Sequence, residues 1–293
     1  MFKDGLLSGK VVIVTGGGTG LGRSMAKRLG ELGAHLVLTS RSREHLDEAA
    51  ATMRQDGISV EAIQCDVRDY VAVEAMVART VERFGRVDAL INNAAGNFLC
   101  KTEELTPNGF ATVIGIVLQG TFNCSHAVGK QLIAQGQGGS LLNIVATYAW
   151  TGQAYVVPSA SAKAGVLAMT QSLAVEWGKY GIRSNAIAPG PFPTDGAWKR
   201  LVPPGLEDVI PGMTVKRIPA GRYGNHDELA NLAAYLLADE SAYITGDCIV
   251  IDGGEWLMGG PFNQMTQIDQ DALGQVFGAM RAPKGSPVPL PQK

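Results

Sequence analysis

A glycine-rich run at residues 15–22, Thr-Gly-Gly-Gly-Thr-Gly-Leu-Gly, constrains the fold more than any other feature of this chain. The apolar, β-branched residues 11–14 precede it, and a pattern typical of a helix follows through Leu32. This order predicts a strand, a tight turn and a helix, with the helix N-terminus facing a dinucleotide pyrophosphate. A further strand at residues 35–39 completes a βαβ unit. The predicted cofactor-binding residues of the turn are Gly16, Gly18, Thr19, Gly20, Leu21 and Gly22.

The end of the second strand indicates which nicotinamide cofactor binds. NAD-selective sites place an acidic residue there to accept from the ribose 2′-hydroxyl, whereas an arginine suits a 2′-phosphate. Here the strand runs into Arg41, and no acidic residue occurs before Glu44. The pattern favours NADP(H), with an ordinary solvated arginine as the alternative.

Strand and helix patterns go on alternating: a helix at 44–55 and strands at 60–64, at 88–91 and up to about Val145. Asp66 follows the third strand, where it is placed either to accept from an adenine amino group or to cap the helix that starts near Tyr70. Ligands of parallel sheets bind beyond the carboxyl ends of the strands. The sequence therefore predicts an α/β fold in which such strand ends form the site. The strand that ends near Val145 faces the start of a helix at Pro158, so we expect Tyr148 and Lys163 to meet there with Ser159 between them.

The composition sets further bounds. With 293 residues and 46% apolar content, the chain can bury one large core, so we expect one domain at 1–260 and an extension at 261–293. A net charge of −2 argues against nucleic acid or an anionic membrane as the main partner. No apolar run of membrane-spanning length and no targeting segment is evident, which predicts a cytoplasmic protein with four free cysteines. The histidines lie at no ligand spacing, which predicts no metal site.

Two later motifs complete a family pattern. Pro189-Gly190 and residues 251–254 (Ile-Asp-Gly-Gly), added to the glycine turn and to residues 92–96 (Asn-Asn-Ala-Ala-Gly), make residues 8–254 resemble the short-chain dehydrogenase/reductase family. The resemblance implies one Rossmann-like domain, a doubly wound seven-stranded parallel sheet with helices on both faces. It also implies a homo-oligomer, since tetramers are frequent in that family.

The chain departs from the family at the catalytic residues. Most members carry Tyr-x-x-x-Lys on one helix face. Here Lys163 is present, but Ser159 occupies the tyrosine position. The usual upstream serine is Ala146, and the usual asparagine is Val117. Ordinary alcohol and ketone chemistry has therefore lost its acid/base.

A tyrosine returns two residues beyond Ala146, at Tyr148. If the extended backbone persists that far, Tyr148 projects to the same side as position 146. Together with residues 92–98, 156–165 and 176–181, this arrangement resembles the branch of NADPH-dependent 2,4-dienoyl-CoA reductases of auxiliary fatty-acid β-oxidation. The resemblance implies that NADPH reduces a dienoyl-CoA thioester to a trans-3-enoyl-CoA.

The same resemblance implies residue roles. Tyr148 and Asn97 supply hydrogen bonds to the thioester oxygen, and Lys163 holds the nicotinamide ribose. Ser159 either connects Lys163 to the substrate or is only a helix N-cap, and both interpretations stay open. The further implied cofactor contacts are Asp66, Val67, Asn93, Ala94, Ala95, Gly96, Pro189, Gly190, Pro191 and Phe192. The implied substrate contacts are Arg68, Phe98, Thr106, Tyr148, Ser159 and Arg200.

Residues 191–226 are rich in proline and glycine, which suggests a substrate lid. A helix is expected at 268–280, before a proline-rich end at 283–293 that we expect to be disordered. Three other functions stay open: a trans-2-enoyl-CoA reductase, a non-catalytic NADP(H)-binding protein, and an alcohol dehydrogenase with an unusual base.

Overall fold

A computed structural model of the chain describes residues 2–194, 196, 201–202, 205–207 and 209–281. Its centre is a seven-stranded parallel sheet in the order β3-β2-β1-β4-β5-β6-β7. The strands are β1 (Val11–Thr15), β2 (His35–Ser40), β3 (Val60–Gln64), β4 (Ala89–Asn92), β5 (Gly139–Ile144), β6 (Ile182–Pro189) and β7 (Cys248–Ile251). The expected parallel sheet is confirmed, and each strand predicted from the sequence lies within about a residue of its place.

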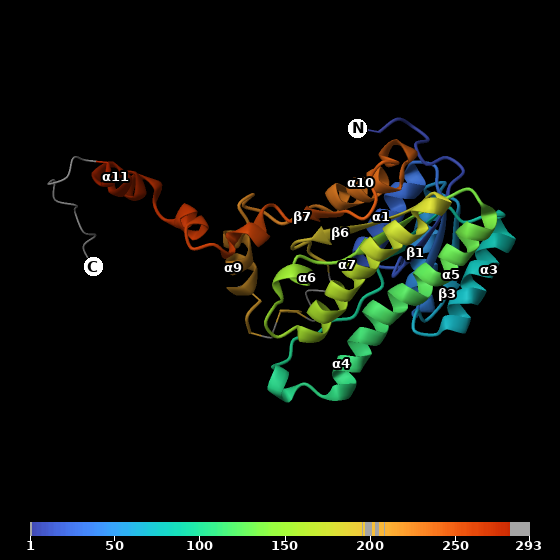
Figure 1. Cartoon of the computed structure of the whole chain (residues 1–293), viewed down its shortest axis with the longest axis horizontal. Coiled ribbons are helices and arrows are strands. Elements are labelled where there is room, and N and C mark those ends of the chain that lie inside the picture. Colours follow the sequence, from blue (N-terminus) through green and yellow to red (C-terminus); the bar gives the residue numbers. More distant parts are fainter. Residues whose placement is uncertain (1, 195, 197–200, 203–204, 208, 282–293) are drawn as a thin grey trace.

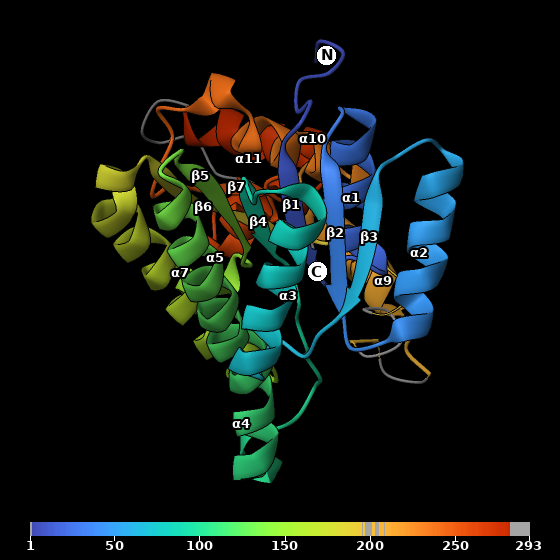
Figure 2. The same ribbon diagram turned by 90° about the vertical axis from the view of Figure 1, so that its right-hand side faces the viewer.

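Helices cover both faces of the sheet, as Figures 1 and 2 show. One layer holds α1 (Gly20–Glu31), α2 (Arg43–Gln55) and α10 (His226–Leu237). The other holds α3 (Tyr70–Phe84), α4 (Pro107–Ile114), α5 (Gly120–Gln135) and α7 (Val157–Trp177). The other α-helices whose bounds lie within the described residues are α6 (Tyr148–Thr151), α9 (Val209–Arg217) and α11 (Gln270–Met280). The fold is therefore a three-layer, doubly wound α/β domain.

Strand β1 is apolar from Val11 to Val14 because both of its faces are buried. Val12 and Val14 point into the core under α1, and Ile13 between them points into the core under α3 and α5. Because both faces are covered, period-two alternation leaves no strand residue for solvent. A continuous β-branched run is the expected pattern for such a strand.

The chain reverses direction across the sheet between β1 and β4. From β1 the strands β2 and β3 lie to one side, whereas β4, β5 and β6 follow on the other. The carboxyl ends of β1 and β4 therefore form the topological switch point of the sheet, which is where open α/β sheets bind ligands. The glycine turn after β1 and the small residues after β4 meet at this point.

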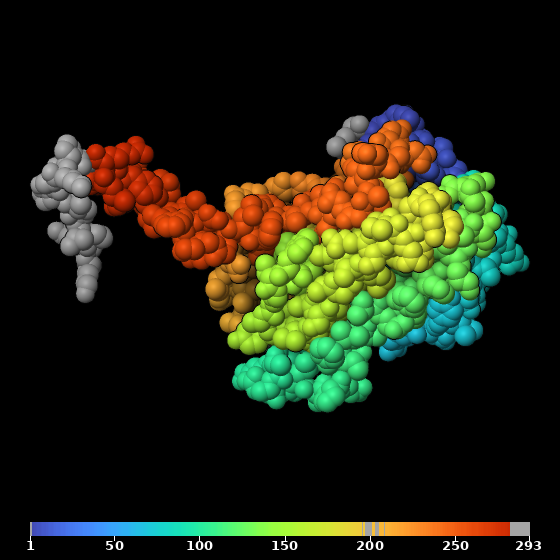
Figure 3. All heavy atoms as spheres, in the orientation of Figure 1, coloured from blue at the N-terminus to red at the C-terminus, as the bar shows by residue number. Residues whose placement is uncertain are grey.

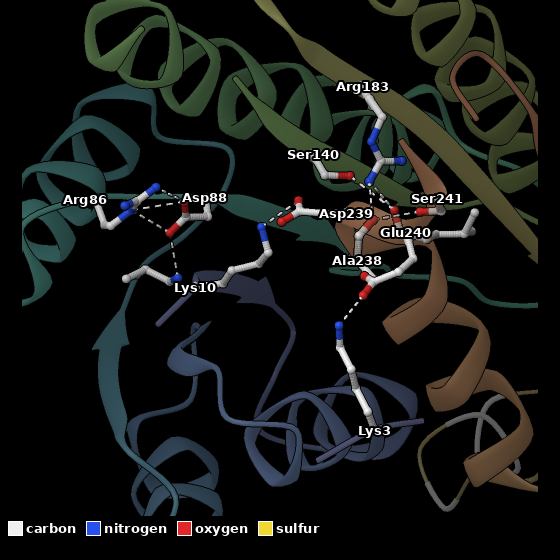
Figure 4. Close-up of polar contacts among 12 residues, drawn as sticks. Lys3, Lys10, Arg86, Asp88, Ser140, Arg183, Ala238, Asp239, Glu240 and Ser241 are labelled. Carbon is white, nitrogen blue, oxygen red and sulfur yellow. Dashed lines mark hydrogen bonds and ion pairs between the residues drawn. The ribbon is translucent and has the colours of Figure 1, made fainter. Parts of the chain in front are cut away.

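Ion pairs fasten the opposite, amino-terminal edge of the sheet (Figure 4). Arg86 binds both carboxylate oxygens of Asp88, and the Asp88 carboxylate accepts from the Val11 backbone N–H at 2.8 Å. Lys10 donates to Asp239 at 2.8 Å. These contacts join β1 to β4 and to the segment after α10, at the end of the molecule away from the glycine turn.

Arg183 on β6 is the part of this edge with the largest expected effect on stability. Its guanidinium donates to the carbonyl oxygens of Leu236 (2.7 Å), Ala238 (3.2 Å) and Ile244 (3.1 Å). We expect Arg183→Met to lower the free energy of unfolding by about 2 kcal/mol, because part-buried carbonyls lose a charged donor. Equilibrium urea unfolding measures the change.

Arg79→Met is the matched control. Arg79 forms an exposed ion pair with Glu61 at 2.8 Å, and such pairs contribute about 1 kcal/mol or less. An equal loss of stability in the two variants would contradict the role assigned to Arg183.

The chain beyond β7 leaves the domain as an arm (Figures 1 and 3). It contains α11, whose bounds lie within two residues of the helix predicted at 268–280. Phe262 is 81% exposed and Met280 is 69% exposed, so this arm carries apolar side chains that the described part of the chain does not cover. None of the described helices is both long enough and apolar enough to cross a membrane.

Candidate active site

The glycine turn and the end of β4 interlock. Gly16 has φ +66°, and a Cβ atom on Gly22 would lie 2.3 Å from the carbonyl oxygen of Gly16. The Asn93 side chain donates to the Thr15 carbonyl at 3.1 Å. The Thr15 hydroxyl accepts from the backbone N–H groups of Asn93 (2.9 Å) and Ala94 (3.0 Å). Only glycine fits at these two positions, so the sequence run and its partner loop form one rigid cradle.

The residues at the start of α1 fit an anionic group. The first turns of α2 and α3 are capped by the side chains of Ser42 and Asp69, whereas Thr19 provides no such side-chain cap to α1. Helix N-termini leave unsatisfied N–H groups and a positive dipole end, which favour a phosphate. A dinucleotide pyrophosphate would satisfy these groups, which supports the predicted role of the glycine turn.

The ends of β2 and β3 bring the predicted adenosine-side residues together. Arg41 is exposed, and its guanidinium forms no hydrogen bond or ion pair within the part of the chain that the structure describes. By contrast, Arg43 is held by Asp47 at 2.8 Å. Arg41 therefore presents a cation beside the strand end, and its charge helps to hold the pKa of Asp66 below its ordinary value.

Asp66 and Arg68, predicted to bind different ligands, bind each other here. Arg68 donates to both Asp66 carboxylate oxygens, with distances of 2.5 to 3.1 Å. This hydrogen bonding is the main cause of the lowered pKa of Asp66. The alternative that Asp66 caps the following helix is wrong, because the Asp69 carboxylate accepts from the N–H groups of Val71 and Ala72.

Buried Asn123 fixes the Val67 position. Its side-chain amide donates to the Val67 carbonyl at 2.9 Å, and a Cβ on Gly120 would collide with the Val67 side chain at 2.5 Å. The turn after β3 is therefore set by α5. Sequence reasoning missed Asn123, as it missed Thr15, because one polar residue in a helix or strand carries no signal of its long-range partner.

Tyr148 does not continue strand β5. The strand ends at Ile144, Thr147 has helical dihedral angles, and Tyr148 begins the short helix α6. The argument from strand alternation is therefore wrong. The N–H of Ala149 bonds the carbonyl of Ala146 at 2.9 Å, which turns the chain as soon as the sheet ladder stops.

Helix α6 nevertheless directs Tyr148 onto α7. The Tyr148 hydroxyl lies 3.0 Å from the Ser159 hydroxyl, and Ser159 is 2% exposed. Burial raises the pKa of Tyr148, and the Ser159 hydrogen bond opposes this rise without cancelling it. The phenol thus stays protonated and able to donate. The N-cap interpretation of Ser159 is wrong, because Val156 precedes the first helical residue of α7.

Lys163 lies one turn beyond Ser159 on α7 and is buried. Its ammonium donates to the carbonyl oxygen of Ile144, the last residue of β5. Burial lowers the pKa of Lys163 to about 8. Tyr148, Ser159 and Lys163 therefore gather where β5 ends and α7 begins, as expected from the sequence.

The positions that lost the family's usual catalytic residues are apolar and filled. Val117 is 1% exposed and lies in a π-helical segment, Gly115–Gln119, between α4 and α5. Ala146 is 9% exposed. Such π-segments are frequent at functional sites. The chain therefore has a π-helical backbone at Val117, although it lacks the asparagine side chain that the family usually carries there.

The segment between β4 and α4 holds the predicted donor Asn97 and two of the predicted substrate contacts, Phe98 and Thr106. The side-chain oxygen Oδ1 of Asn97 accepts from the Phe98 backbone N–H at 2.9 Å, which leaves the side-chain nitrogen Nδ2 as the donor. Phe98 packs against the core under α4 and α7. Thr106 is exposed and caps α4 by accepting from Gly109 at 3.0 Å. Arg200 lies outside the described residues.

The loop after β6 passes close to the glycine turn. A Cβ on Gly20 would lie 3.4 Å from the methyl group of Thr194. Gly190 approaches Asp252 so closely that a Cβ there would lie 2.4 Å from the aspartate side chain. Phe192 is buried and, with Pro191 and Asp252, lines a cavity of about 120 Å³. The predicted residues at 189–192 thus lie beside the cofactor cradle.

Comparisons with known proteins agree with this geometry. Residues 16–255 match the family described as Enoyl-(Acyl carrier protein) reductase. A protein of Bacillus subtilis (strain 168) named "Probable 2,4-dienoyl-CoA reductase", of the (2E)-enoyl-CoA-producing kind, is 51% identical over 86% of this chain and 99% of its own. A Caenorhabditis elegans protein named "Probable 2,4-dienoyl-CoA reductase 3", of the (3E)-enoyl-CoA-producing kind, is 41% identical over 99% of this chain and 95% of its own.

Solved structures lead to the same family. A short chain dehydrogenase from Bacillus anthracis is 48% identical, with a TM-score of 0.78 over 86% of this chain and 99% of that one. A gluconate 5-dehydrogenase from Burkholderia cenocepacia, in complex with NADP and tartrate, is 30% identical, with a TM-score of 0.79 over 85% of this chain and 96% of that one. By sequence, fold and site, the chain is an oxidoreductase that belongs to the short-chain dehydrogenase/reductase family.

Proposed function

We propose that this chain is an NADPH-dependent 2,4-dienoyl-CoA reductase that produces trans-3-enoyl-CoA. The observation that carries the proposal is the hydrogen-bonded pair of the half-buried Tyr148 hydroxyl and the buried Ser159 hydroxyl, with Ser159 one turn from Lys163. This arrangement replaces the usual Tyr-x-x-x-Lys acid/base with a neutral hydrogen-bond donor. The relatives named above support the substrate class.

The chemistry needs such a donor. NADPH, when bound, supplies a hydride to the far end of the conjugated diene, which moves negative charge onto the thioester oxygen. Tyr148 donates to that oxygen, and the Ser159 hydroxyl donates to the Tyr148 oxygen, so the phenol proton remains directed at the substrate. The Asn97 amide nitrogen supplies the second donor. Preorganised donors of this kind stabilise the developing charge.

The position of the product double bond depends on where the resulting dienolate takes up a proton. Protonation at the α-carbon gives a 3-enoyl thioester, and protonation at the γ-carbon gives the conjugated 2-enoyl thioester. The two relatives carry names of both kinds. We favour the 3-enoyl product because the polar donors, which can admit water, surround the thioester end of the diene.

Reduction of trans-2-enoyl thioesters is the second candidate. The matching family is described as Enoyl-(Acyl carrier protein) reductase, and the same donors would stabilise a simple enolate. The 2,4-diene remains our first choice because the relatives that extend over most of this chain are named for it.

One assay separates these functions. Purified chain is mixed with NADPH and either a medium-chain trans-2,trans-4-dienoyl-CoA or the matching trans-2-enoyl-CoA, with NADH as a control, and the absorbance of the reduced cofactor is followed. We expect preferred turnover of the diene with NADPH and a 3-enoyl product by proton NMR. Preferred turnover of the monoene would move the assignment to an enoyl reductase. NADPH binding without turnover of either would favour a non-catalytic binding protein.

The charge of Lys163 predicts the pH dependence of kcat. Burial lowers its pKa to about 8, so the side chain is an ammonium below that pH and a neutral amine above it. Loss of the cation removes its support for the negative charge that develops on the thioester oxygen bound by Tyr148, and we expect kcat to fall as pH rises through about 8. Lys163→Arg keeps the charge and should lose this dependence, even if its turnover is lower. A pH–rate profile that is unchanged in Lys163→Arg would contradict the assignment.

A homo-oligomer in the cytoplasm, active in auxiliary β-oxidation, belongs to the same proposal. Strand β7 is an edge of the sheet, and all four of its residues are only half-buried. The exposed apolar residues of the C-terminal arm also lack a cover within the described chain. Light scattering with size-exclusion chromatography tests the predicted tetramer.

A further inference from the structure

His226 joins three segments that the proposed reaction uses. It is the first residue of α10, and its Nδ1 lies 2.8 Å from the Ser24 hydroxyl on the first turns of α1. Its Nε2 lies 2.7 Å from the carbonyl oxygen of Pro193, in the loop after β6. The Ser24 hydroxyl also lies 3.2 Å from the carbonyl oxygen of Gly20. One imidazole therefore connects the helix of the cofactor turn to the loop beside it.

The hydrogen-bonding roles follow from the partners. A carbonyl oxygen only accepts, so Nε2 carries the hydrogen that bonds Pro193. In the neutral ring Nδ1 is then an acceptor, and Ser24 donates its single hydroxyl hydrogen to Nδ1 at 2.8 Å and not to the more distant Gly20 carbonyl oxygen at 3.2 Å. The imidazole thus works as a bridge with one donor and one acceptor, a pairing that an alkyl or phenyl side chain cannot provide.

Hydrogen bonds at the N-terminus of α10 fix the backbone that carries His226. Asn225 and Glu228 form a capping box at the start of α10, and Arg222 binds both carboxylate oxygens of Glu228 at 2.7 and 2.9 Å. These hydrogen bonds lower the pKa of Glu228 to about 2, so its carboxylate stays charged at working pH. The His226 backbone is therefore fixed, and the ring can hold the more exposed Pro193 loop.

The loop that His226 holds lies over the cofactor cradle. Thr194, next to Pro193, approaches Gly20 of the glycine turn. Pro191 and Phe192, just before it, are predicted cofactor contacts, and the Pro191 carbonyl accepts from Gly224 at 3.2 Å. The loop thus spans from the end of β6 to the glycine turn.

We propose that His226 is a positioning residue for the cofactor, which fixes the 191–194 loop against the glycine turn before NADPH binds. This role rests on the proposed function, because it assumes NADPH in the cradle. Without the bridge, NADPH binding must also order the loop. The bridge consists of two neutral hydrogen bonds. At about 0.7 kcal/mol net each, their loss amounts to about 1.4 kcal/mol and should weaken NADPH binding by about tenfold.

The test compares two ligands on two variants of His226, together with one variant each of Asn231 and Ser24. NADPH reaches the 191–194 loop, whereas adenosine 2′,5′-bisphosphate has only the adenosine half of the cofactor and should not. We expect His226→Phe to raise the Kd of NADPH about tenfold and to leave the Kd of the bisphosphate within about twofold. His226→Gln, whose amide can still donate to Pro193, should recover most of the affinity. Fluorescence titration measures NADPH, and calorimetry measures the bisphosphate.

Asn231→Ala is the matched control. Asn231 accepts from Arg28 at 2.9 Å, another hydrogen bond between α10 and α1, but one that does not involve the cofactor loop. We expect an unchanged Kd for NADPH in this variant. Ser24→Ala removes the α1 partner of His226 and should also raise the Kd of NADPH. It replaces His226→Phe in the test if that variant does not fold.

Three results would overturn the role of His226: unchanged NADPH affinity in His226→Phe, an equal loss of both ligands, or no recovery in His226→Gln. Absence of NADPH binding in the unaltered chain would instead overturn the proposed function, and this role with it. The two failures are therefore distinguishable.

Discussion

Tyr148→Phe should lower kcat for the dienoyl thioester by about a hundredfold to a thousandfold, the usual cost of one donor to a developing oxyanion. The hydroxyl is the only group removed, and the ring remains on α6, packed against α7. Because the lost hydrogen bond strengthens in the transition state, the affinity for NADPH should hardly change. Steady-state kinetics and a binding titration of the same preparation measure the two quantities.

Tyr243→Phe provides the matched control. Tyr243 is fully exposed, precedes β7 and belongs to no part of the site. Its removal should leave both kcat and NADPH affinity unchanged. Unchanged turnover in Tyr148→Phe would remove Tyr148 from the mechanism. A loss of NADPH affinity equal to the loss of turnover would make Tyr148 a cofactor contact and not a substrate donor.

Arg41→Asp should weaken NADPH binding by about tenfold to a hundredfold and leave NADH binding nearly unchanged. A charge-assisted contact with a phosphate contributes about 1.5 to 3 kcal/mol, and the new carboxylate adds repulsion with the same group. Arg41 is suited to this contact because its exposed guanidinium has no hydrogen-bond or ion-pair partner among the described residues. Titrations with both reduced cofactors give the ratio of Kd values.

Arg43→Asp makes the same change of charge two residues further along. Arg43 is paired with Asp47, so its guanidinium is already occupied. We expect a much smaller effect on NADPH than in Arg41→Asp. Equal losses for NADPH and NADH in Arg41→Asp would remove the residue from the 2′-phosphate site. If Arg41→Asp and Arg43→Asp raised the Kd of NADPH equally, Arg41 would act only through the net charge of the surface and not through a specific contact.

Short-range patterns were sufficient for most of the fold. Val12, Ile13 and Val14 are apolar without alternation because the sheet has helices on both faces. The glycine turn between β1 and α1 needs positive φ at Gly16 and the absence of a Cβ at Gly22. Such requirements involve residues close together in the chain, so they can be recognised in short stretches of sequence.

Contacts between distant residues were predicted less well. The sequence indicated that Tyr148 and Ser159 come together, but it gave the wrong local reason, because Tyr148 lies in helix α6 and not on an extended strand. Asp66 and Arg68 were predicted as separate ligand contacts, and the folded chain pairs them. The preference of a charged side chain for a neighbour or a ligand depends on the geometry of both.

The sequence by itself determined the order of strands and helices, the cradle at residues 15–22 and the group of residues at the end of β5. Only the tertiary structure decided which hydroxyl reaches Tyr148, how far Lys163 is buried, and that His226 bridges α1 to the Pro193 loop. Secondary structure follows from periodicity and backbone geometry within a few residues. Hydrogen bonds and desolvation between remote segments depend on distances of a few tenths of an ångström, which arise only when the layers pack.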